Sequence, residues 1–361
     1  MNILILSAGT RDKVVQYFKR ELGESGNIIA TDCSNLAPAA YEADKFYLVT
    51  RINVPGYMDS ILDICKKEKI DAVFSLIDPE LSMLAKERDR FLEIGTIPVV
   101  SEYELVETCF NKFEMSKLFA AHNLKTAKCY MSREDFFTAK DKNEIDYPVF
   151  VKPVCGSASM HINQVTSDEE LDGLFHMYDD LMIQEYMDGT EFGADVYIDM
   201  LTGKVTGLFV KEKIKMRAGE TDKSVSVKDE KLFAQIVEFV EKAGFRGMID
   251  IDMFKIGDEY YFSEVNPRFG GGYPHAYESG VNMPALFIQN ISDMKSGEKT
   301  VGEYFSTSSG VISDRKLKDE DSKELLSDRV KKLLDGYNEG IVMMKYNEVM
   351  IRNMSGETLV P

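Results

Sequence analysis

Short apolar runs alternate with amphipathic stretches through the first hundred residues. Ile3–Leu6, Asn27–Thr31 and Ala72–Leu76 have the length and composition of buried strands, and Asp12–Leu22 has the apolar spacing of a helix. Strands separated by helices in this way predict an open, parallel α/β sheet. Ligands of such sheets bind at the rim where the strands end. The residues that follow these strands, and are expected along that rim, are Gly9, Thr10, Arg11, Asp32, Asp78 and Glu80.

The pattern changes after residue 110. Strand-like alternation occupies residues 147–165 and 182–217, helices are expected near 111–126 and 229–243, and a hairpin is expected at 247–266. Strands and helices without regular alternation favour an α+β architecture. The expected domains are an N-terminal α/β domain (1–110), two α+β subdomains (111–182 and 183–298) and a C-terminal extension of unknown role (299–361).

The hairpin places several polar side chains on one face. A turn centred on Gly257-Asp258 fixes which residues lie opposite each other. The predicted pairs are Phe254 with Phe262, Asp252 with Glu264, and Asp250 with Asn266. Because side chains alternate in direction along a strand, the even-numbered residues share a face that ends with Arg268. Like charges opposed across a ladder are destabilising, so the two facing carboxylates need a cation.

A hard divalent cation such as Mg²⁺ meets this need, since it binds oxygen ligands and completes its shell with phosphates and water. Asp252, Glu264 and Asn266 supply the oxygens. Arg268 beyond them suits a bidentate contact with a phosphate or carboxylate group. An exposed polar hairpin face without a metal is the alternative. For Asp250 three roles stay open: metal ligand, helper of the site, or partner of a lysine.

Two segments upstream are compatible with nucleotide binding. Lys152 and the small-residue loop 156–159 that follows it can enclose phosphates. The backbone of residues 184–187 can pair with an adenine edge, and Glu191 after the next turn can bind ribose hydroxyls. Taken alone, a plain connector and a surface hairpin explain these two segments equally well.

Composition narrows the classes of partner. The formal net charge of -18 repels a phosphate backbone, so we expect neither nucleic acid nor an anionic membrane as a partner. Five scattered cysteines without a CxxC pair indicate a reduced, cytoplasmic protein without structural zinc. Against this acidic background, residues 204–217 contain five basic residues and one acidic residue. They predict either a small anionic ligand or a sheet edge protected by lysines.

The first strand offers little support for a dinucleotide. Only Gly9 stands where a GxGxxG turn is expected, and Asp32 at the end of the second strand is the feature that favours NAD(P). An NAD(P)-dependent oxidoreductase is therefore a minor alternative.

Taken in order, these segments resemble the ATP-grasp superfamily, and are closest to single-unit proteins similar to the carbamoyl-phosphate synthase large subunit. The resemblance spans residues 1 to about 295 and is most specific at Asp252 and at Glu264-Val265-Asn266-Pro267-Arg268. It implies an α/β N-terminal open parallel sheet domain followed by an α+β ATP-grasp fold whose two subdomains enclose the nucleotide. The implied cofactors are ATP and Mg²⁺, with Mn²⁺ as an alternative metal.

The resemblance also implies roles for individual residues. The phosphates would contact Lys112, Lys152, Lys213, Gly156, Ser157 and Ser159; the adenosine would contact Glu185, Tyr186, Met187 and Glu191; and the metal would contact Asp252, Glu264 and Asn266. Arg268 and Lys152 would be catalytic residues. The family's phosphate loop usually has a glycine where this chain has His161, so we expect the closure of this loop to differ.

The implied reaction joins a small-molecule carboxylate to an amine through an acyl phosphate and releases ADP and phosphate. Carbamoyl-phosphate synthesis itself is disfavoured, because that reaction uses two such units and a glutaminase. A nucleotide-binding regulatory protein without turnover is the main alternative. The tail from residue 300 has no motif, and a homodimer interface is one role open to it. Candidates for recognising the unidentified substrates are Thr10, Arg11, Asp78, Glu80, Tyr273, His275 and Glu278.

Overall fold

The N-terminal part of the chain forms a five-stranded parallel sheet, as the apolar pattern predicts. The computed structural model describes residues 1–156, 163–297 and 325–351. The strands of this sheet run in the order β3-β2-β1-β4-β5, and every neighbouring pair is parallel. They are β1 (Asn2–Leu6), β2 (Asn27–Asp32), β3 (Lys45–Leu48), β4 (Ala72–Ser75) and β5 (Ile97–Pro98). The helices of this part are α1 (Asp12–Leu22), α2 (Tyr57–Glu68), α3 (Asp78–Lys86), α4 (Arg88–Glu93) and α5 (Tyr103–Phe110), with 3-10 turns at Gly23–Ser25 and Pro38–Tyr41.

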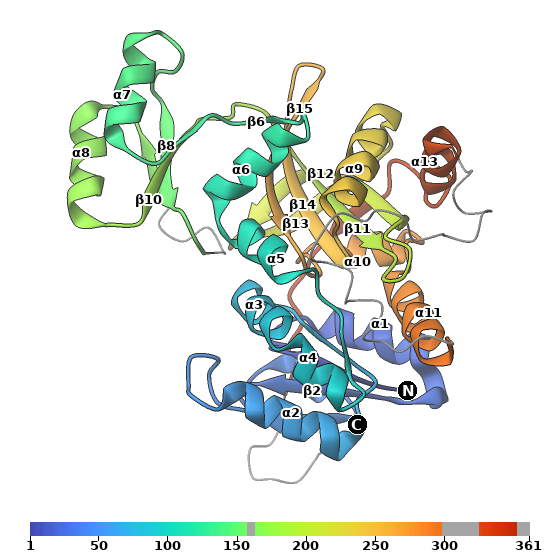
Figure 1. Ribbon diagram of the computed structural model, residues 1–361. Coiled ribbons are helices and arrows are strands. Elements are labelled where there is room, and N and C mark those ends of the chain that lie inside the picture. The colour runs from blue at the N-terminus through green and yellow to red at the C-terminus, as the bar shows by residue number, and fades with distance from the viewer. Residues whose placement is uncertain (157–162, 298–324, 352–361) are drawn as a thin grey trace.

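Helices cover both faces of the parallel sheet (Figure 1), because its central strands are apolar on both sides. Ile5 of β1 belongs to the core cluster that contains α1, whereas the next residue, Leu6, belongs to the cluster that contains α2. Phe18 of α1 and Phe74 of β4 both pack edge-on against Phe287, which lies on α11 (Met283–Ser296). The first of the two clusters therefore extends from the parallel sheet into the rest of the molecule.

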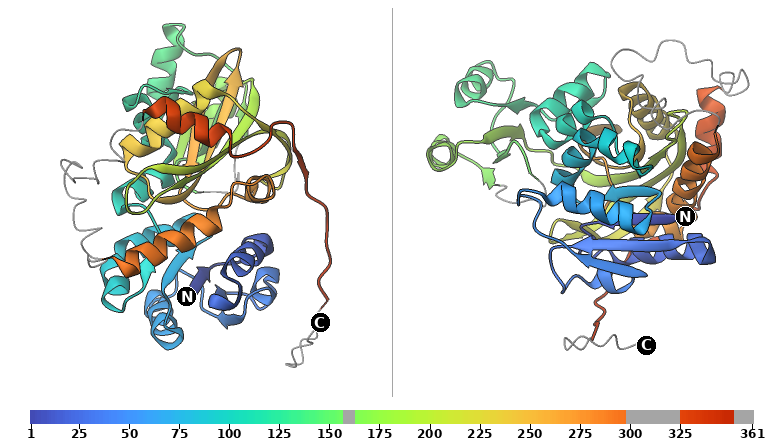
Figure 2. Two further views of the ribbon diagram at one scale, coloured as in Figure 1. Left: turned by 90° about the vertical axis from the view of Figure 1, so that its right-hand side faces the viewer. Right: turned by 60° about the horizontal axis from the view of Figure 1, so that its bottom comes forward.

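The remainder of the chain builds two mainly antiparallel sheets, and the smaller one stands apart from the larger (Figures 1 and 2). The small sheet has the order β7-β10-β8-β9 and carries α7 and α8. Its elements are β7 (Cys129–Tyr130), α7 (Arg133–Asp141), β8 (Val149–Pro153), β9 (Asn163–Val165), α8 (Asp168–Met177) and β10 (Leu181–Glu185). α6 (Lys112–Ala121) leads into it from α5.

The large sheet has the order β16-β13-β12-β11-β14-β15-β6, in which only the pair β15–β6 is parallel. α6 and α9 pack against it. Its strands are β6 (Lys125–Thr126), β11 (Thr190–Ile198), β12 (Val205–Arg217), β13 (Glu220–Val227), β14 (Gly247–Ile256), β15 (Glu259–Asn266) and β16 (Val342–Met344). The helices beside it are α9 (Glu230–Ala243), α10 (Tyr273–Glu278) and α13 (Leu326–Leu334). None of the described helices is both long and apolar enough to cross a membrane.

The β14–β15 hairpin has both predicted polar pairs at its base, but its register differs nearer the turn. The pairing shifts by one residue after Asp252. Phe262 consequently lies opposite Met253 and not, as predicted, opposite Phe254. Ser263 is the extra residue of this β-bulge. Because side-chain direction changes at the bulge, Phe262 points into the core, where it is fully buried.

The C-terminal segment completes the large sheet, since β16 pairs with the edge strand β13. His275 of α10 helps to anchor it. The hydroxyl group of Ser224 on β13 donates to Nδ1 of His275 at 2.8 Å, and Nε2 donates to the carbonyl group of Ile341 at 3.0 Å, in the tautomer that fits both partners. A neutral imidazole thus connects α10, β13 and the C-terminal segment.

His275 makes the stability of the fold depend on pH. Burial, and next the charge of Lys211, lowers the pKa of His275 to about 4, whereas the unfolded chain titrates near 6.5. Between these values the unfolded state binds more protons, so the free energy of unfolding falls as the pH falls from 6.5 to 4. We expect His275→Gln to remove about 2–3 kcal/mol of the difference between pH 7.5 and pH 4.5 in urea unfolding. His176→Gln, at an exposed position of α8, is the control; equal pH dependence in the two variants would contradict the assignment.

Candidate functional site

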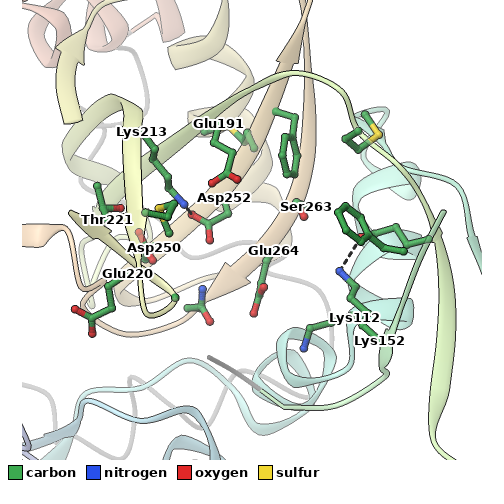
Figure 3. A pocket seen from close by; sticks show the side chains of 18 of the residues that line it. Lys112, Lys152, Glu191, Lys213, Glu220, Thr221, Asp250, Asp252, Ser263 and Glu264 are labelled. Atoms are coloured by element: carbon green, nitrogen blue, oxygen red, sulfur yellow. Dashed lines mark hydrogen bonds and ion pairs between the residues drawn. The ribbon is translucent and has the colours of Figure 1, made fainter. Parts of the chain in front are cut away.

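A large pocket lies on the large sheet, where the small sheet and the parallel sheet approach it. Its volume is about 570 Å³. Figure 3 shows the acidic residues of the β14–β15 hairpin on one wall, with Lys112 and Lys152 across from them. The predicted residues that line it are Lys112, Lys152, Gly156, Glu185, Tyr186, Met187, Glu191, Lys213, Asp252, Glu264, Asn266 and Arg268. The predicted loop residues Ser157 and Ser159, and also His161, lie outside the described residues.

The acidic wall has one paired and one unpaired carboxylate. Asp252 and Glu264 lie opposite each other on β14 and β15. Lys213 of β12 forms an ion pair with Asp252. Burial alone lowers the pKa of Lys213, but the charges of Asp252 and then Asp250 outweigh it and raise the pKa. Glu264 accepts no hydrogen bond from the part of the chain that the structure describes, and burial raises the pKa of Glu264 even though Lys112 opposes the rise.

The donor atoms fit a hard divalent cation. The charge of Asp252 is one cause of the raised pKa of Glu264, and a bound dication would remove that repulsion. The Oδ1 atom of Asn266 accepts a hydrogen bond from Arg268 at 3.1 Å and keeps a second lone pair. Among the described residues, no three His, Cys, Asp or Glu side chains are placed to hold a metal. Two acids and one amide would therefore need phosphate or water oxygens to complete a metal's shell.

Two ammonium groups face this wall (Figure 3). Nζ of Lys152 donates to Oε1 of Gln184 at 2.6 Å, and burial lowers the pKa of Lys152 while Glu264 opposes the change. Nζ of Lys112 donates to the carbonyl group of Gly156 and so holds the beginning of the predicted phosphate loop. Both lysines are fixed on the protein before any anion binds.

The end of the pocket beyond the lysines is largely apolar. The ring of Tyr186 packs on Phe150 with centroids 5.2 Å apart, and Met187 is buried beside them. Glu185 contributes mainly its backbone here, because its carboxylate accepts a hydrogen bond from the backbone N–H of Lys128 at 3.0 Å. Side chains of this kind suit contact with a flat aromatic group.

Sequence reasoning missed several side chains that line the pocket. They are Phe150, Gln184, Met253, Phe254, Ser263, Glu220 and Thr221. Gln184 could have been found as a polar side chain buried in an otherwise apolar strand. Phe254 and Ser263 depend on the β-bulge, and Glu220 depends on a contact between distant segments, so no local pattern indicates them.

Arg268 is held by the parallel sheet. Its Nε and Nη2 atoms lie 3.1 Å from the two carboxylate oxygens of Asp78 at the beginning of α3. Nη1 donates to the carbonyl group of Phe269 at 3.2 Å. Because Asp78, Phe269 and Asn266 all accept from it, the guanidinium of Arg268 is a fixed positive charge at the wall. Asp78 thus acts on the pocket through Arg268.

Most of the other recognition candidates do not reach the pocket. Of the seven residues proposed, only Arg11 lines it. Glu80 follows β4 as predicted, but it is fully buried and accepts hydrogen bonds from Tyr57 and Ser75, so its carboxylate does not face a ligand. Tyr273 and His275 are buried in the core.

Two further sequence interpretations change. Of the basic side chains on β12, Lys213 lines the pocket, whereas Lys211 is buried in an ion pair with Asp195. Lys215 and Arg217 are exposed, in the part of β12 where its pairing with β13 shifts register twice. The carboxylate of Asp32 accepts hydrogen bonds from backbone N–H groups of its own rim, those of Gly9 and Ser34, each at 2.9 Å. Asp32 therefore has a local structural role at this rim, which accounts for its position without NAD(P).

Two known protein families match this chain, one at the parallel sheet and one mainly at the large sheet. The family described as "PylC-like, N-terminal domain" matches residues 3–100. The family described as "ATP-grasp in the biosynthetic pathway with Ter operon" matches residues 177–308.

The similar known proteins are enzymes by name. The formate-dependent phosphoribosylglycinamide formyltransferase of Proteus mirabilis is 26% identical over 81% of this chain and 71% of that protein. The match to the enzyme of the same name from Saccharolobus solfataricus covers 46% of this chain and 41% of that protein. The carbamoyl phosphate synthase large chain of Clostridium acetobutylicum is 23% identical over 76% of this chain, which corresponds to 26% of that protein.

Solved structures share the fold. The biotin carboxylase domain of Hydrogenobacter thermophilus 2-oxoglutarate carboxylase, in complex with MgADP and bicarbonate, has a TM-score of 0.65 at 15% identity and covers 80% of this chain and 69% of that chain. The L-amino acid ligase of Bacillus licheniformis has a TM-score of 0.62 at 20% identity and covers 80% of this chain and 73% of that chain. The predicted fold class is confirmed: a parallel N-terminal sheet is followed by an ATP-grasp unit, and the predicted resemblance to the ATP-grasp superfamily is confirmed as well.

Proposed function

We propose that this protein is an ATP-dependent carboxylate–amine ligase that forms an amide through an acyl phosphate and releases ADP and phosphate. The observation that supports it most is the facing pair Asp252 and Glu264, set opposite Lys112 and Lys152 in one pocket. Carboxylates that would bind a metal and ammonium groups that would bind phosphates thus line the same cavity. A solved structure that contains MgADP shares this fold.

In the proposed reaction, a carboxylate oxygen of the acid attacks the γ-phosphorus of ATP, and the bond to the β–γ bridging oxygen breaks to release ADP. The amine then attacks the acyl carbon, the C–O bond to phosphate breaks, and the nitrogen loses a proton. The apolar end with Phe150 and Tyr186 would hold the adenine, and Glu191 the ribose. Lys152, Lys112 and Lys213 would balance the charge of the phosphates.

Asp252, Glu264 and Asn266 would hold Mg²⁺, which when bound screens the phosphate oxygens from the incoming carboxylate. Arg268 would neutralise charge on the acyl phosphate, and the Asp78 contacts keep its guanidinium in one orientation. Loss of one such fixed charge typically lowers kcat by about 10²–10³-fold. Exclusion of water from the pocket when substrates are bound would limit hydrolysis of the acyl phosphate.

The metal assignment can be tested by ligand-induced stabilisation. Glu264→Gln keeps the shape of the side chain and removes its charge, so we expect Mg²⁺-dependent affinity for ATP to weaken by about tenfold or more. The measurement is the rise in Tm with ATP in the presence and absence of Mg²⁺. Glu259→Gln, on the same strand but paired with surface lysines, should retain the wild-type rise. Similar Mg²⁺ dependence in both variants would contradict the assignment.

The acyl phosphate can be trapped. We expect the protein with Mg²⁺, ATP and hydroxylamine to convert at least one member of a carboxylic acid panel to its hydroxamate, with one ADP per hydroxamate, because hydroxylamine replaces the natural amine. Release of AMP and pyrophosphate would indicate an adenylating ligase. Stabilisation by Mg²⁺ and ATP without turnover across the panel would favour the nucleotide-binding regulatory protein.

A further inference from the structure

The end of the pocket beyond Asp252 and Glu264 holds a carboxylate without an ion pair and a guanidinium nitrogen without a hydrogen-bond partner among the described residues. Resting on the proposed function, we propose that the acid substrate is an α-amino acid, with its carboxylate held between Arg11 and Arg268 and its ammonium group held by Asp250.

The positive side is formed by Arg11, which reaches the pocket from the rim of the parallel sheet. Its Nη2 atom forms an ion pair with Glu220 at the beginning of β13, at 2.9 Å. Its Nη1 atom is buried and has no hydrogen-bond partner among the described residues. A buried donor without an acceptor costs free energy that a ligand's carboxylate would recover. Arg268 supplies a second positive charge in the same part of the pocket.

The negative side is formed by Asp250, which lies between Glu220 and Asp252 in the wall (Figure 3). Within the described residues its carboxylate accepts no hydrogen bond and forms no ion pair. The two lysines whose charges act on it are already engaged, since Lys211 pairs with Asp195 and Lys213 pairs with Asp252.

The neighbouring acids do not compete with Asp250 for a cationic ligand. Glu220 is neutralised by Arg11 and by Lys345 of the C-terminal segment, with Nζ of Lys345 2.8 Å from it. Asp78 is neutralised by Arg268. Of Asp78, Glu220 and Asp250, Asp250 is therefore the one without an ion pair among the described residues, although the charges of Arg11 and Arg268 act on it.

The spacing of these groups limits the length of the ligand. Asp250 lies directly opposite Asn266, whose side chain contacts Arg268. The backbone of Gly270 closes on Asp250 so tightly that a Cβ there would lie 2.5 Å from the carboxyl carbon, and at Gly271 it would lie 2.8 Å from Nη1 of Arg11. Asp250, Arg11 and Arg268 thus line one part of the pocket, which suits a ligand whose ammonium and carboxylate groups are joined by a single carbon.

This arrangement predicts selection against simple acids. An acid without an ammonium group would leave Asp250 in the pocket wall without an ion-pair partner. We therefore expect discrimination of about 10- to 100-fold in kcat/KM between an α-amino acid and its des-amino analogue.

The experiment compares the twenty L-amino acids with matched des-amino acids, such as alanine with propionate and glutamate with glutarate. Hydroxamate and ADP formation are measured with the full chain, Mg²⁺, ATP and hydroxylamine, and the rise in Tm is measured with Mg²⁺ and a non-hydrolysable ATP analogue. At least one amino acid should give turnover and a rise in Tm, with a tenfold or greater advantage over its des-amino partner.

Variants identify the groups responsible. Asp250→Asn should reduce kcat/KM for the preferred amino acid by about 10- to 100-fold and change that for the des-amino acid far less, so the ratio between them falls. Arg11→Gln should reduce both, because both ligands carry the carboxylate. Asp258→Asn at the exposed hairpin turn and Arg51→Gln on the surface are the matched controls and should keep the wild-type ratio.

Three results would overturn the inference. Equal use of des-amino acids would reject the substrate class while leaving the ligase proposal intact. If no acid gives a hydroxamate, the ligase proposal fails, and the absence of any amino-acid-dependent rise in Tm would then reject this inference as well. Loss of the Mg²⁺-dependent response to the nucleotide analogue in Asp250→Asn, without any amino acid present, would make Asp250 a metal ligand.

Discussion

The pocket depends on the repulsion between Asp252 and Glu264, two carboxylates that β14 and β15 hold opposite each other. Such a pair is unfavourable by itself, and the elements around it supply the positive charge that makes it tolerable. Lys213 comes from β12, and Lys112 and Lys152 come from α6 and the small sheet. Because these lysines come from three separate elements, the charge of the acidic pair attracts groups from both the small sheet and the large sheet.

The same principle extends to the parallel sheet. Asp78 pairs with Arg268 and Arg11 pairs with Glu220, so two ion pairs of opposite polarity join this sheet to the large one across the pocket. Burial of aromatic groups around Phe287 supplies the apolar part of the same contact. Removing one partner of a buried ion pair typically costs about 3–5 kcal/mol, because the other charge is left unpaired. Residues that shape the pocket therefore also hold the sheets together.

The sequence could predict what depends on local order and could not predict what depends on distant contacts. The parallel sheet and the Asp252–Glu264 pair follow from apolar runs and from a turn with strand alternation, and both are present. The bulge at Ser263 could not be predicted, because the alternation of apolar and polar residues does not show where a one-residue shift in register occurs.

Charge assignments show the same limit. Period two places Lys211 and Lys213 on one face of β12, but the burial of Lys211 against Asp195 is set by β11, a different strand. Glu80 follows a strand, as a ligand-binding residue would, yet Tyr57 and Ser75 enclose it. In both cases the sequence gives the position of a charge correctly, and a partner from elsewhere in the chain decides whether that charge is available to a ligand.

The three glycines after Arg268 show how these levels combine. None of them has a positive φ, so conformational freedom does not explain them. Space does: a Cβ at Gly270 would meet Asp250, one at Gly271 would meet Arg11 and Glu220, and one at Gly272 would lie 3.0 Å from Nζ of Lys211. Each glycine thus admits a charged group from a different element. Arg268 and its polar neighbours contribute their side chains to the pocket. The three glycines that follow have no side chains, and the space this leaves is occupied by charged groups from β12, β13, β14 and the parallel sheet.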